Sequence, residues 1–414
     1  MNNNYIIRRA KSSSDAEKLR TLFSKVFYPE DVGTLAATMF NHLPGMEKKY
    51  WFIVEEKNTG NIISAFALIP WVWELEGVRL RVAEMGIVGT LEDYRGQGLM
   101  RVLNEEFDKT LEEEKIDIVV IQGIPGFYDQ FGYSYSIPLE NHINLPLYTI
   151  PEISKNSAYT FRLAEEEDIP FLENEDENYR AYYSLSSYRD EAHWKYMLTE
   201  SLKTEYGSEF WVMENKEKSE MYYCRILEQG FGTGLIISEI SENISVEALK
   251  SLFSFCKEKA ITRDKPYIRL NLHNDSIAGR LATSMGAKDG SSYAWQIKIP
   301  DVIRFLRTII PVLEKRVQMS SFKGFSGKFR LDFFRTRVDL LWKNGVLETI
   351  KPGVGECQMV FSINVDHFPA LSLGHRTWRE LRYIKPDIFP STGSSALFVE
   401  TIFPSRLSWI YEQY

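Results

Sequence analysis

The sequence is poor in cysteine and histidine, and neither residue type occurs in a pattern that binds metal. Its 414 residues include three cysteines, Cys224, Cys256 and Cys357, which are far apart in the chain. An odd number at such spacing indicates no disulfide framework and no CxxC site. The six histidines show no HExxH motif or other ligand spacing. We therefore assign no metal ligand.

Long hydrophobic runs and an excess of positive charge are also missing. The first residues, MNNNYIIRR, contain no hydrophobic signal core, and no run reaches the length that spans a membrane. A net charge of −8 argues against a nucleic-acid binder and favours, weakly, a cationic substrate. We therefore expect a cytoplasmic protein with no membrane span and no nucleic-acid partner.

The composition that remains is that of an ordinary globular protein. Hydrophobic residues make up 44% of the chain and charged residues 26%, which are common values for soluble domains. A chain of 414 residues is too long for one hydrophobic core. The length therefore predicts two or three domains.

The most informative stretch runs from Glu84 to Leu103. An apolar, β-prone run ends at an acidic turn, the sequence Arg95-Gly-Gln-Gly98 follows, and apolar residues then recur at helical spacing. Glycines let the main chain approach a ligand closely, and the free N–H groups of a helix start favour an anion. The order strand, glycine turn, helix therefore predicts an anion-binding turn, with an ordinary surface turn as the alternative.

A second motif follows a predicted buried strand. Residues 118–122 are rich in β-branched side chains, and the sequence Gly-Ile-Pro-Gly interrupts them. Tyr128 then stands four residues before Gly132, which an aromatic residue follows. The alternative for this motif is a half-buried structural tyrosine, which is common in a chain with 22 tyrosines.

Together the two motifs resemble the GNAT acetyltransferases. The pattern from Val88 to Met100 is similar to their acetyl-CoA loop, Arg/Gln-x-x-Gly-x-Gly/Ala, except that Met100 replaces the small last residue. The resemblance implies that main-chain groups of the preceding strand hold the pantetheine arm and that the turn binds the pyrophosphate. The implied acetyl-CoA site consists of Val88, Gly89, Thr90, Arg95, Gly96, Gln97, Gly98, Leu99, Met100 and Arg101.

The same resemblance implies a catalytic role for Tyr128. In the family the corresponding hydroxyl lies near the thioester sulfur and protonates the leaving thiolate. A phenol of pKa ~10 is a suitable donor to a thiolate of pKa ~8.5. No cysteine or serine with a paired histidine is evident, so the sequence favours direct transfer over a covalent intermediate.

The order of predicted elements suggests a duplicated α/β unit. The first copy reads as a strand at 5–8, a helix, a loop that starts at Phe27, antiparallel strands, the glycine turn, a helix and a final strand. Similar segments recur about 154 residues later. The second copy has Ser241-Glu242 in place of the glycine turn and Ala282 in place of the tyrosine, so we expect it to lack the chemistry.

The last part of the chain differs from both copies. An amphipathic helix is predicted over 302–317, and alternating strands and short helices follow. This part resembles a sterol-carrier-like domain. The sequence thus predicts an α/β (α+β) chain with a catalytic GNAT domain at 1–150, a degenerate GNAT-like domain at 151–299 and a sterol-carrier-like domain at 300–414.

This order of parts resembles the enhanced-intracellular-survival type of acetyltransferase. That resemblance implies small-molecule amine substrates, including aminoglycosides and other polyamine-like compounds, and a homo-oligomer, which is a hexamer in that family. It also implies that the terminal carboxylate, here that of Tyr414, enters the active site as the base. The aromatic ending of the chain fits a docked tail or ordinary packing. The alternatives are an acetyltransferase for protein or peptide lysines and a non-catalytic protein that binds acyl-CoA or lipid.

Overall fold

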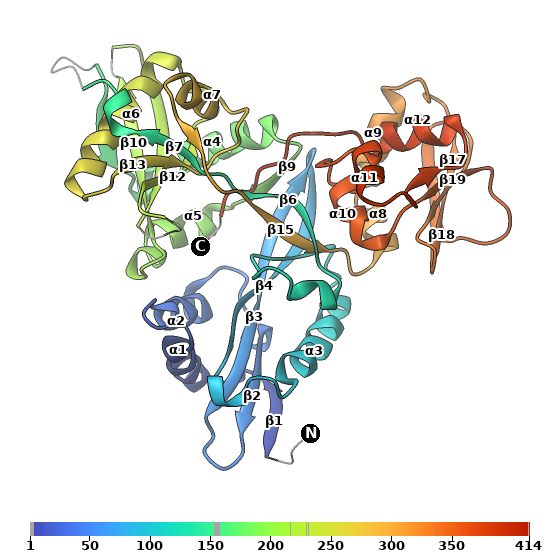
Figure 1. Ribbon diagram of the computed structural model, residues 1–414, viewed down its shortest axis with the longest axis horizontal. Helices are drawn as coiled ribbons and strands as arrows, with labels where there is room; N and C mark the ends of the chain where they lie inside the picture. Colours follow the sequence, from blue (N-terminus) through green and yellow to red (C-terminus); the bar gives the residue numbers. More distant parts are fainter. Residues whose placement is uncertain (1–3, 153–157, 216, 229, 231, 413) are drawn as a thin grey trace.

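Three β-sheets, all formed by described residues, organise the chain into three lobes (Figure 1). The computed structural model describes residues 4–152, 158–215, 217–228, 230, 232–412 and 414. In Figure 1 the first sheet lies in the lower lobe, the second at the upper left and the third at the upper right. No helix among the described residues is long and apolar enough to cross a lipid bilayer.

The first sheet contains most of the N-terminal strands and two strands from later in the chain. Its order is β1-β2-β3-β4-β5-β15-β6, and β9 pairs with the far end of β3. The strands are β1 (Tyr5–Arg9), β2 (Trp51–Glu56), β3 (Ile62–Leu75), β4 (Val78–Thr90), β5 (Ile118–Ile121), β6 (Ser134–Glu140), β9 (Leu185–Tyr188) and β15 (Tyr293–Lys298).

Helices cover both faces of the first sheet (Figure 1). Helix α3 (Leu99–Glu113) packs on one face, where its buried Phe107 meets the rings of Phe52 and Phe66 edge-on. Helices α1 (Ser14–Val26) and α2 (Val32–His42) pack on the other. The sequence predicted α1 and α3 but only the start of a loop before α2.

Helix α2 was missed because its stability comes from tertiary contact. Asp31 caps it by accepting a hydrogen bond from the Thr34 amide, 3.0 Å away. Gly33 packs so closely on α1 that an added Cβ would lie 2.0 Å from the Ser24 hydroxyl. Residues such as Pro29, Gly33 and Thr34 are typical of turns, so propensity alone did not indicate a helix here.

The second sheet repeats the arrangement of the first. It has the order β14-β7-β13-β12-β11-β10-β8, with a parallel pair, β12 and β13, in its interior. Its strands are β7 (Ile143–Pro146), β8 (Thr160–Leu163), β10 (Ser208–Asn215), β11 (Glu220–Leu227), β12 (Leu235–Ile240), β13 (Tyr267–Leu270) and β14 (Lys288–Asp289). Its helices are α4 (Ile169–Tyr182), α5 (Glu191–Leu198), α6 (Val246–Thr262) and α7 (Ile277–Ser284).

The two sheets exchange strands. Strand β7, from the end of the first predicted domain, pairs with β13 of the second sheet. Strand β15, from the end of the second, lies between β5 and β6 of the first sheet. The predicted boundaries at residues 150 and 299 remain a proposal. Each half contributes a strand to the sheet of the other half, so the two halves interlock.

The third sheet forms an additional α/β unit. It has the order β18-β17-β16-β19-β20. Its strands are β16 (Gly327–Asp332), β17 (Arg337–Lys343), β18 (Val346–Pro352), β19 (Met359–Ser362) and β20 (Phe389–Pro390). Its helices are α8 (Val302–Thr308), α9 (Ile310–Gln318), α10 (Phe368–Ser372), α11 (Trp378–Ile384) and α12 (Gly393–Ile402).

The single helix predicted over residues 302–317 was wrong in one respect. The structure divides it into α8 and α9 at Ile309. Pro311 explains the break, because proline has no N–H to donate and its ring crowds the preceding turn. Both helices remain amphipathic and bury Phe305, Leu306 and Leu313.

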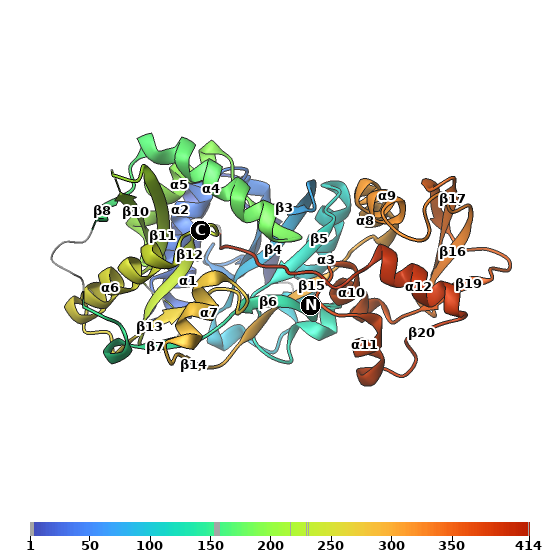
Figure 2. The ribbon, with the colours of Figure 1, turned by 90° about the horizontal axis from the view of Figure 1, so that it is seen from above.

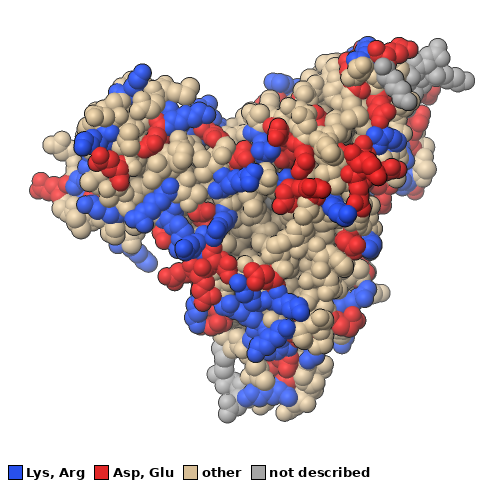
Figure 3. Space-filling model, turned by 180° about the vertical axis from the view of Figure 1, so that it is seen from behind, with Lys and Arg blue, Asp and Glu red and all other residues tan. Residues whose placement is uncertain are grey.

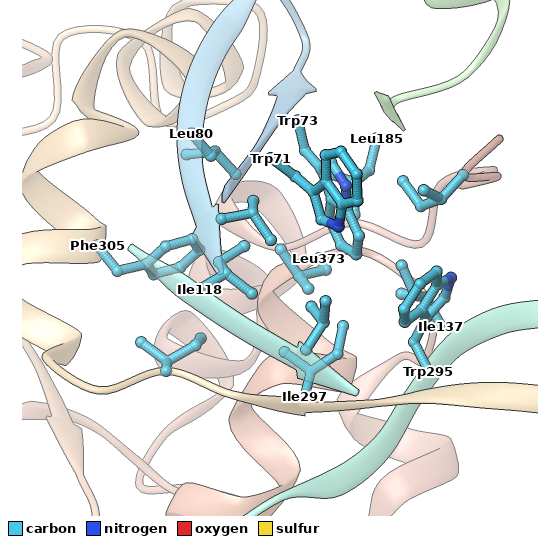
Figure 4. Close-up of a cluster of buried hydrophobic side chains, with 14 of the residues drawn as sticks. Trp71, Trp73, Leu80, Ile118, Ile137, Leu185, Trp295, Ile297, Phe305 and Leu373 are labelled. Atoms are coloured by element: carbon cyan, nitrogen blue, oxygen red, sulfur yellow. The ribbon is translucent and has the colours of Figure 1, made fainter. Parts of the chain in front are cut away.

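A buried hydrophobic cluster joins the three lobes (Figure 4). Trp71 and Trp73 of β3 lie in it with Leu185 of β9, and Phe305 and Leu373 come from the third lobe. Seen from above, the chain that follows α12 leaves the third lobe and crosses to the second (Figure 2). This packing fixes the first sheet and the end of the chain relative to each other.

Candidate active site

Strands β4 and β5 run parallel for only three residue pairs and then separate. The last pair is Glu84 with Val120. Beyond it β4 pairs with β3 alone, and β5 pairs with β15 on its other side. Among the described strands, none pairs with the β5-facing edge of β4 from Met85 to Thr90. An extended ligand that carries amide groups can add to such an edge as a strand does. The predicted residues Val88, Gly89 and Thr90 lie on it.

The glycine turn directly follows this open edge. Gly96 and Gly98 have φ angles of +74° and +75°, a left-handed conformation that favours glycine. A Cβ added at either residue would meet nothing within 4 Å, so the main chain faces open space. Gly98 is the N-cap of α3, and no side chain caps the helix there. The first N–H groups of α3 are therefore available to an anion.

Side chains hold the turn in place from both sides. The Arg95 guanidinium donates to the carbonyl of Thr90 at 3.3 Å. The Gln97 side chain accepts from the hydroxyl of Tyr5 at 2.9 Å. The structure thus brings the predicted residues 88–90 and 95–101 together at one end of β4. Open main chain, left-handed glycines and an uncapped helix start fit the diphosphate and pantetheine of a coenzyme A.

Tyr128 lies a few residues after β5, the strand from which β4 separates. It begins a short 3-10 helix, and only 6% of the residue is exposed. Its ring packs on Gly123, where an added Cβ would lie 2.2 Å from the ring. Burial raises the pKa of Tyr128 to about 12, and the neighbouring Tyr293 adds to the effect. The phenol is therefore protonated at neutral pH and can donate.

The second half of the chain supports this tyrosine. The Tyr293 hydroxyl of β15 donates to the carbonyl of Gly123. The Gln296 side chain on the same strand donates to that carbonyl at 2.8 Å. The ring of Tyr128 packs against Gly123. By holding the Gly123 carbonyl, the exchanged strand β15 therefore helps to position a predicted catalytic group.

Glu84 is a site residue that the sequence reasoning missed. It is 2% exposed and stands where β4 and β5 separate. The Trp71 indole donates to its carboxylate at 2.8 Å and the Gln122 amide at 3.4 Å. Burial raises the pKa of Glu84 to about 7, and the charge of Glu412 adds to the effect. A glutamate inside the apolar run from Val82 to Val88 was the available signal.

Tyr414 reaches this carboxylate from the end of the described chain. Its ring stacks on Trp71 with centroids 5.9 Å apart. Its hydroxyl accepts from Gln122 at 2.8 Å and lies 3.5 Å from Glu84. The main-chain oxygen of Tyr414 accepts from Arg225 at 2.8 Å. A small pocket is lined by Trp71, Trp73, Glu84, Gln122, Trp295, Ile410, Tyr411, Glu412 and Tyr414.

Charged side chains of both signs cover the back of the lower lobe, which holds the first sheet (Figure 3). No group of three or more His, Cys, Asp or Glu that could hold a metal occurs in the described ranges.

Residues 7–136 match the family of acetyltransferase (GNAT) domains. These residues form a GNAT acetyltransferase domain. The match includes the open edge of β4, the glycine turn, Glu84 and Tyr128. The prediction of an enzyme of the acyltransferase class is thereby confirmed, and domains of this family take their acyl group from acyl-CoA.

Solved structures share the fold of the whole chain, not only of its GNAT domain. A probable N-acyltransferase from Enterococcus faecalis is 14% identical with a TM-score of 0.73, and 99% of each chain is covered. A GCN5-related N-acetyltransferase from Anabaena variabilis is 15% identical with a TM-score of 0.68, covering 99% of this chain and 100% of that one. Eis1 from Mycobacterium abscessus is 13% identical with a TM-score of 0.61 and the same coverage.

No curated protein matches the sequence. At the identities above, the likeness shows the fold alone. It confirms the predicted fold class, in which a GNAT domain is followed by a second GNAT-like unit and a further α/β unit. The sterol-carrier likeness of the third unit stays a prediction.

The variant Gly98→Val tests the turn of the GNAT domain. A β-branched residue is strained at φ +75°, and its side chain would enter the open space before α3. We expect the dissociation constant of CoA, measured by calorimetry, to rise at least ~10-fold, or about 1.4 kcal/mol. Gly355→Val is the matched control, because Gly355 is also left-handed and open but lies in the third lobe. Equal CoA affinity in both variants would contradict a role for the turn.

Proposed function

We propose that the protein is an N-acetyltransferase that moves the acetyl group of acetyl-CoA directly to a small-molecule amine. One observation carries the proposal. The edge of β4 that faces β5 is unpaired from Met85 to Thr90, with the glycine turn after it and the buried Glu84 before it, and the buried phenol of Tyr128 follows β5. A coenzyme bound along the edge would place its acyl end between groups suited to moving protons.

In this proposal the main chain of Val88, Gly89 and Thr90 holds the pantetheine arm. The N–H groups that follow Arg95, through Arg101, hold the diphosphate. When bound, acetyl-CoA supplies the thioester carbonyl that an amine attacks. The protein's residues bind the coenzyme, orient it, accept a proton from the amine and donate a proton to the sulfur.

Glu84 is our candidate for the base. A carboxyl with a pKa of about 7 is partly ionised at neutral pH, and a general base near the working pH is the most effective. The carboxylate oxygen of Glu84 would accept a proton from the substrate ammonium. The acetylated product carries no such proton, so the base must release it to solvent in each turnover.

The carboxylate of Tyr414 is the second candidate for the base. Its main-chain oxygen accepts from the Arg225 guanidinium, and a cation beside a carboxylate stabilises the ionised form and weakens it as a base. We therefore favour Glu84, with the Tyr414 hydroxyl in a supporting role beside it. The variant Tyr414→Phe keeps the main-chain group and removes only the hydroxyl, so it separates the two roles.

Tyr128 is our candidate for the general acid. Its hydroxyl would donate a proton to the sulfur of the departing thiolate, and the second proton lost by the attacking nitrogen would return to the phenolate. The raised pKa of Tyr128 keeps the proton on the phenol until the thiolate forms. The fixed ring over Gly123 orients the hydroxyl, which supplies part of the catalytic effect by position alone.

The lining of the pocket at Glu84 favours a cationic acceptor. Its lining residues include three tryptophans, Tyr414 and the acidic residues Glu84 and Glu412. Aromatic faces and carboxylates attract ammonium groups. We propose aminoglycosides or other polyamine-like amines, with protein or peptide lysines as the alternative. By resemblance, the protein would be a cytoplasmic homo-oligomer, and a hexamer would be measurable by light scattering.

A thiol-release assay tests the proposal. We expect release of CoA from acetyl-CoA with at least one amine from a panel of aminoglycosides, polyamines and lysine peptides, and acetylated amine in equal amount by mass spectrometry. Release with lysine peptides alone would select the second substrate class. No release with any amine, together with lipid that remains bound through purification, would instead support a non-catalytic acyl-CoA or lipid-binding protein.

A further inference from the structure

The second half keeps the strand geometry of the first, and side chains from the chain's own end pack into its core. Strands β12 and β13 pair in parallel over only three residues, as β4 and β5 do. Past Ile237, β12 pairs only with β11 among the described strands. Trp409 and Tyr411 lie in the hydrophobic core of this half, 1% and 2% exposed. The Tyr411 hydroxyl donates to Glu242 at 3.1 Å, just past the end of β12.

The main chain of this segment is also held by the second half. We call residues 407–412 and Tyr414 the tail. The amide of Ser184 donates to Leu407 and the amide of Trp409 donates to Leu185, so the tail runs beside β9. The Tyr179 hydroxyl of α4 donates to the Trp409 carbonyl at 2.5 Å. The Tyr411 amide donates to that same hydroxyl at 3.2 Å.

A buried cluster of charges holds the last part of the tail. Arg189 and Arg225 both bond to the carboxylate of Glu239, at 2.6 and 2.8 Å, and all three side chains are 0% exposed. The carboxyls of Asp176 and Glu412 also face this pair of arginines. Both arginines donate further bonds to the tail: to the Glu412 carbonyl, at 2.5 and 2.7 Å, and from Arg225 also to Tyr414.

The geometry points to a role for the half that lacks a glycine turn. We propose that this half is a receptor for the tail, and that Arg225 is a positioning residue that sets Tyr414 against Glu84. The contacts form one chain: Arg225 holds the main chain of Tyr414, and the Tyr414 hydroxyl meets Gln122 and Glu84 of the GNAT domain. The catalytic consequence rests on the proposed function, but the receptor role does not.

The variant Arg225→Gln tests the receptor in the full chain. It leaves Glu239 with its two bonds to Arg189 and removes the cation that holds the main-chain oxygens of Glu412 and Tyr414. We expect amide hydrogen exchange in residues 407–412 to become at least ~10-fold faster, since bonds to charged groups are the stronger ones. We expect kcat with the amine to fall ~10- to 100-fold, while CoA affinity changes less than twofold.

A matched control and a second variant keep the test decisive. Arg263→Gln removes a guanidinium from the same half that pairs with Glu209, outside the tail, and should leave tail exchange and kcat unchanged. Tyr179→Phe removes the hydroxyl that bridges Trp409 and Tyr411, and should also speed exchange in the tail. It provides the test if Arg225→Gln does not fold.

Two results would overturn the proposal. The first is tail exchange that is equally slow in the wild type and in both tail variants. The second is fast tail exchange with undiminished kcat, which would leave Arg225 no positioning role. Hydrogen exchange does not depend on turnover, so it tests whether the second half holds the tail even if no amine is acetylated. The experiment therefore distinguishes failure of the proposed function from failure of the receptor proposal.

Discussion

Replacing Glu84 by glutamine is expected to lower kcat by ~10²- to 10⁴-fold, the usual contribution of a general base. The amide has the same shape and can still accept from Trp71, so the pocket should keep its structure. The dissociation constant of CoA should not change, because the turn at residues 95–101 is intact. Steady-state kinetics with the best amine and calorimetry with CoA measure the two quantities.

The pH dependence of the same variant gives an independent signature. Wild-type activity should rise with pH through about 7, because Glu84 acts as a base only when it is ionised and its pKa is raised to about 7. Above that pH the amine itself is the remaining titrating group. The Glu84→Gln variant should lack this acidic limb. A variant with full activity, or one that keeps the limb, would contradict the assignment.

Glu84→Gln should also make the protein more stable at alkaline pH. The folded-state pKa of this acid lies above its ordinary value of 4.5, so folding favours the protonated form. The free energy of unfolding should therefore fall as pH rises from about 4.5 to about 7, by about 3 kcal/mol in all. The variant should escape this loss at pH 8. Glu114→Gln, in a surface pair with Lys49, is the control and should show no such gain.

Replacing Tyr128 by phenylalanine is expected to lower kcat by ~10²- to 10³-fold with CoA affinity unchanged. The ring that packs on Gly123 is retained, and only the proton donor to sulfur is removed. Because the pKa of Tyr128 is about 12, its loss should not alter the pH profile between pH 6 and 9. Rates of thiol release at several pH values measure both effects.

Tyr133→Phe is the matched control for this variant. Tyr133 packs against Tyr128 with ring centroids 6.1 Å apart, and its buried hydroxyl has no hydrogen-bond partner among the described residues. Removing that hydroxyl should leave kcat within about twofold of the wild type and should not weaken folding. If both variants lost activity equally, Tyr128 would have a packing role rather than a chemical one.

Local sequence was sufficient to predict the strand, turn and helix to which we assign the coenzyme. The two glycines of the turn and the helical spacing of Leu99, Leu103 and Phe107 are encoded within about 25 residues, where periodicity and turn chemistry act directly. The structure has these elements where they were predicted. The role of the turn remains a prediction.

Glu84 was missed because its properties come from residues distant in sequence. Trp71, Gln122 and Tyr414 surround it, and they belong to β3, to the residue after β5 and to the tail. No local pattern reports that a carboxyl will be buried by such partners. The exchange of β7 and β15 between the two sheets was missed for a similar reason. The two halves have similar strands, so local sequence does not indicate with which sheet each strand pairs.

The most direct test of the central claim is a crystal structure of the protein with CoA. We expect the pantetheine amides to bond to the main chain of β4 between Met85 and Thr90, and the diphosphate to accept from the N–H groups of residues 96–101. The sulfur should lie between Tyr128 and Glu84. CoA bound elsewhere, or a closed gap between β4 and β5 at millimolar CoA, would contradict the account.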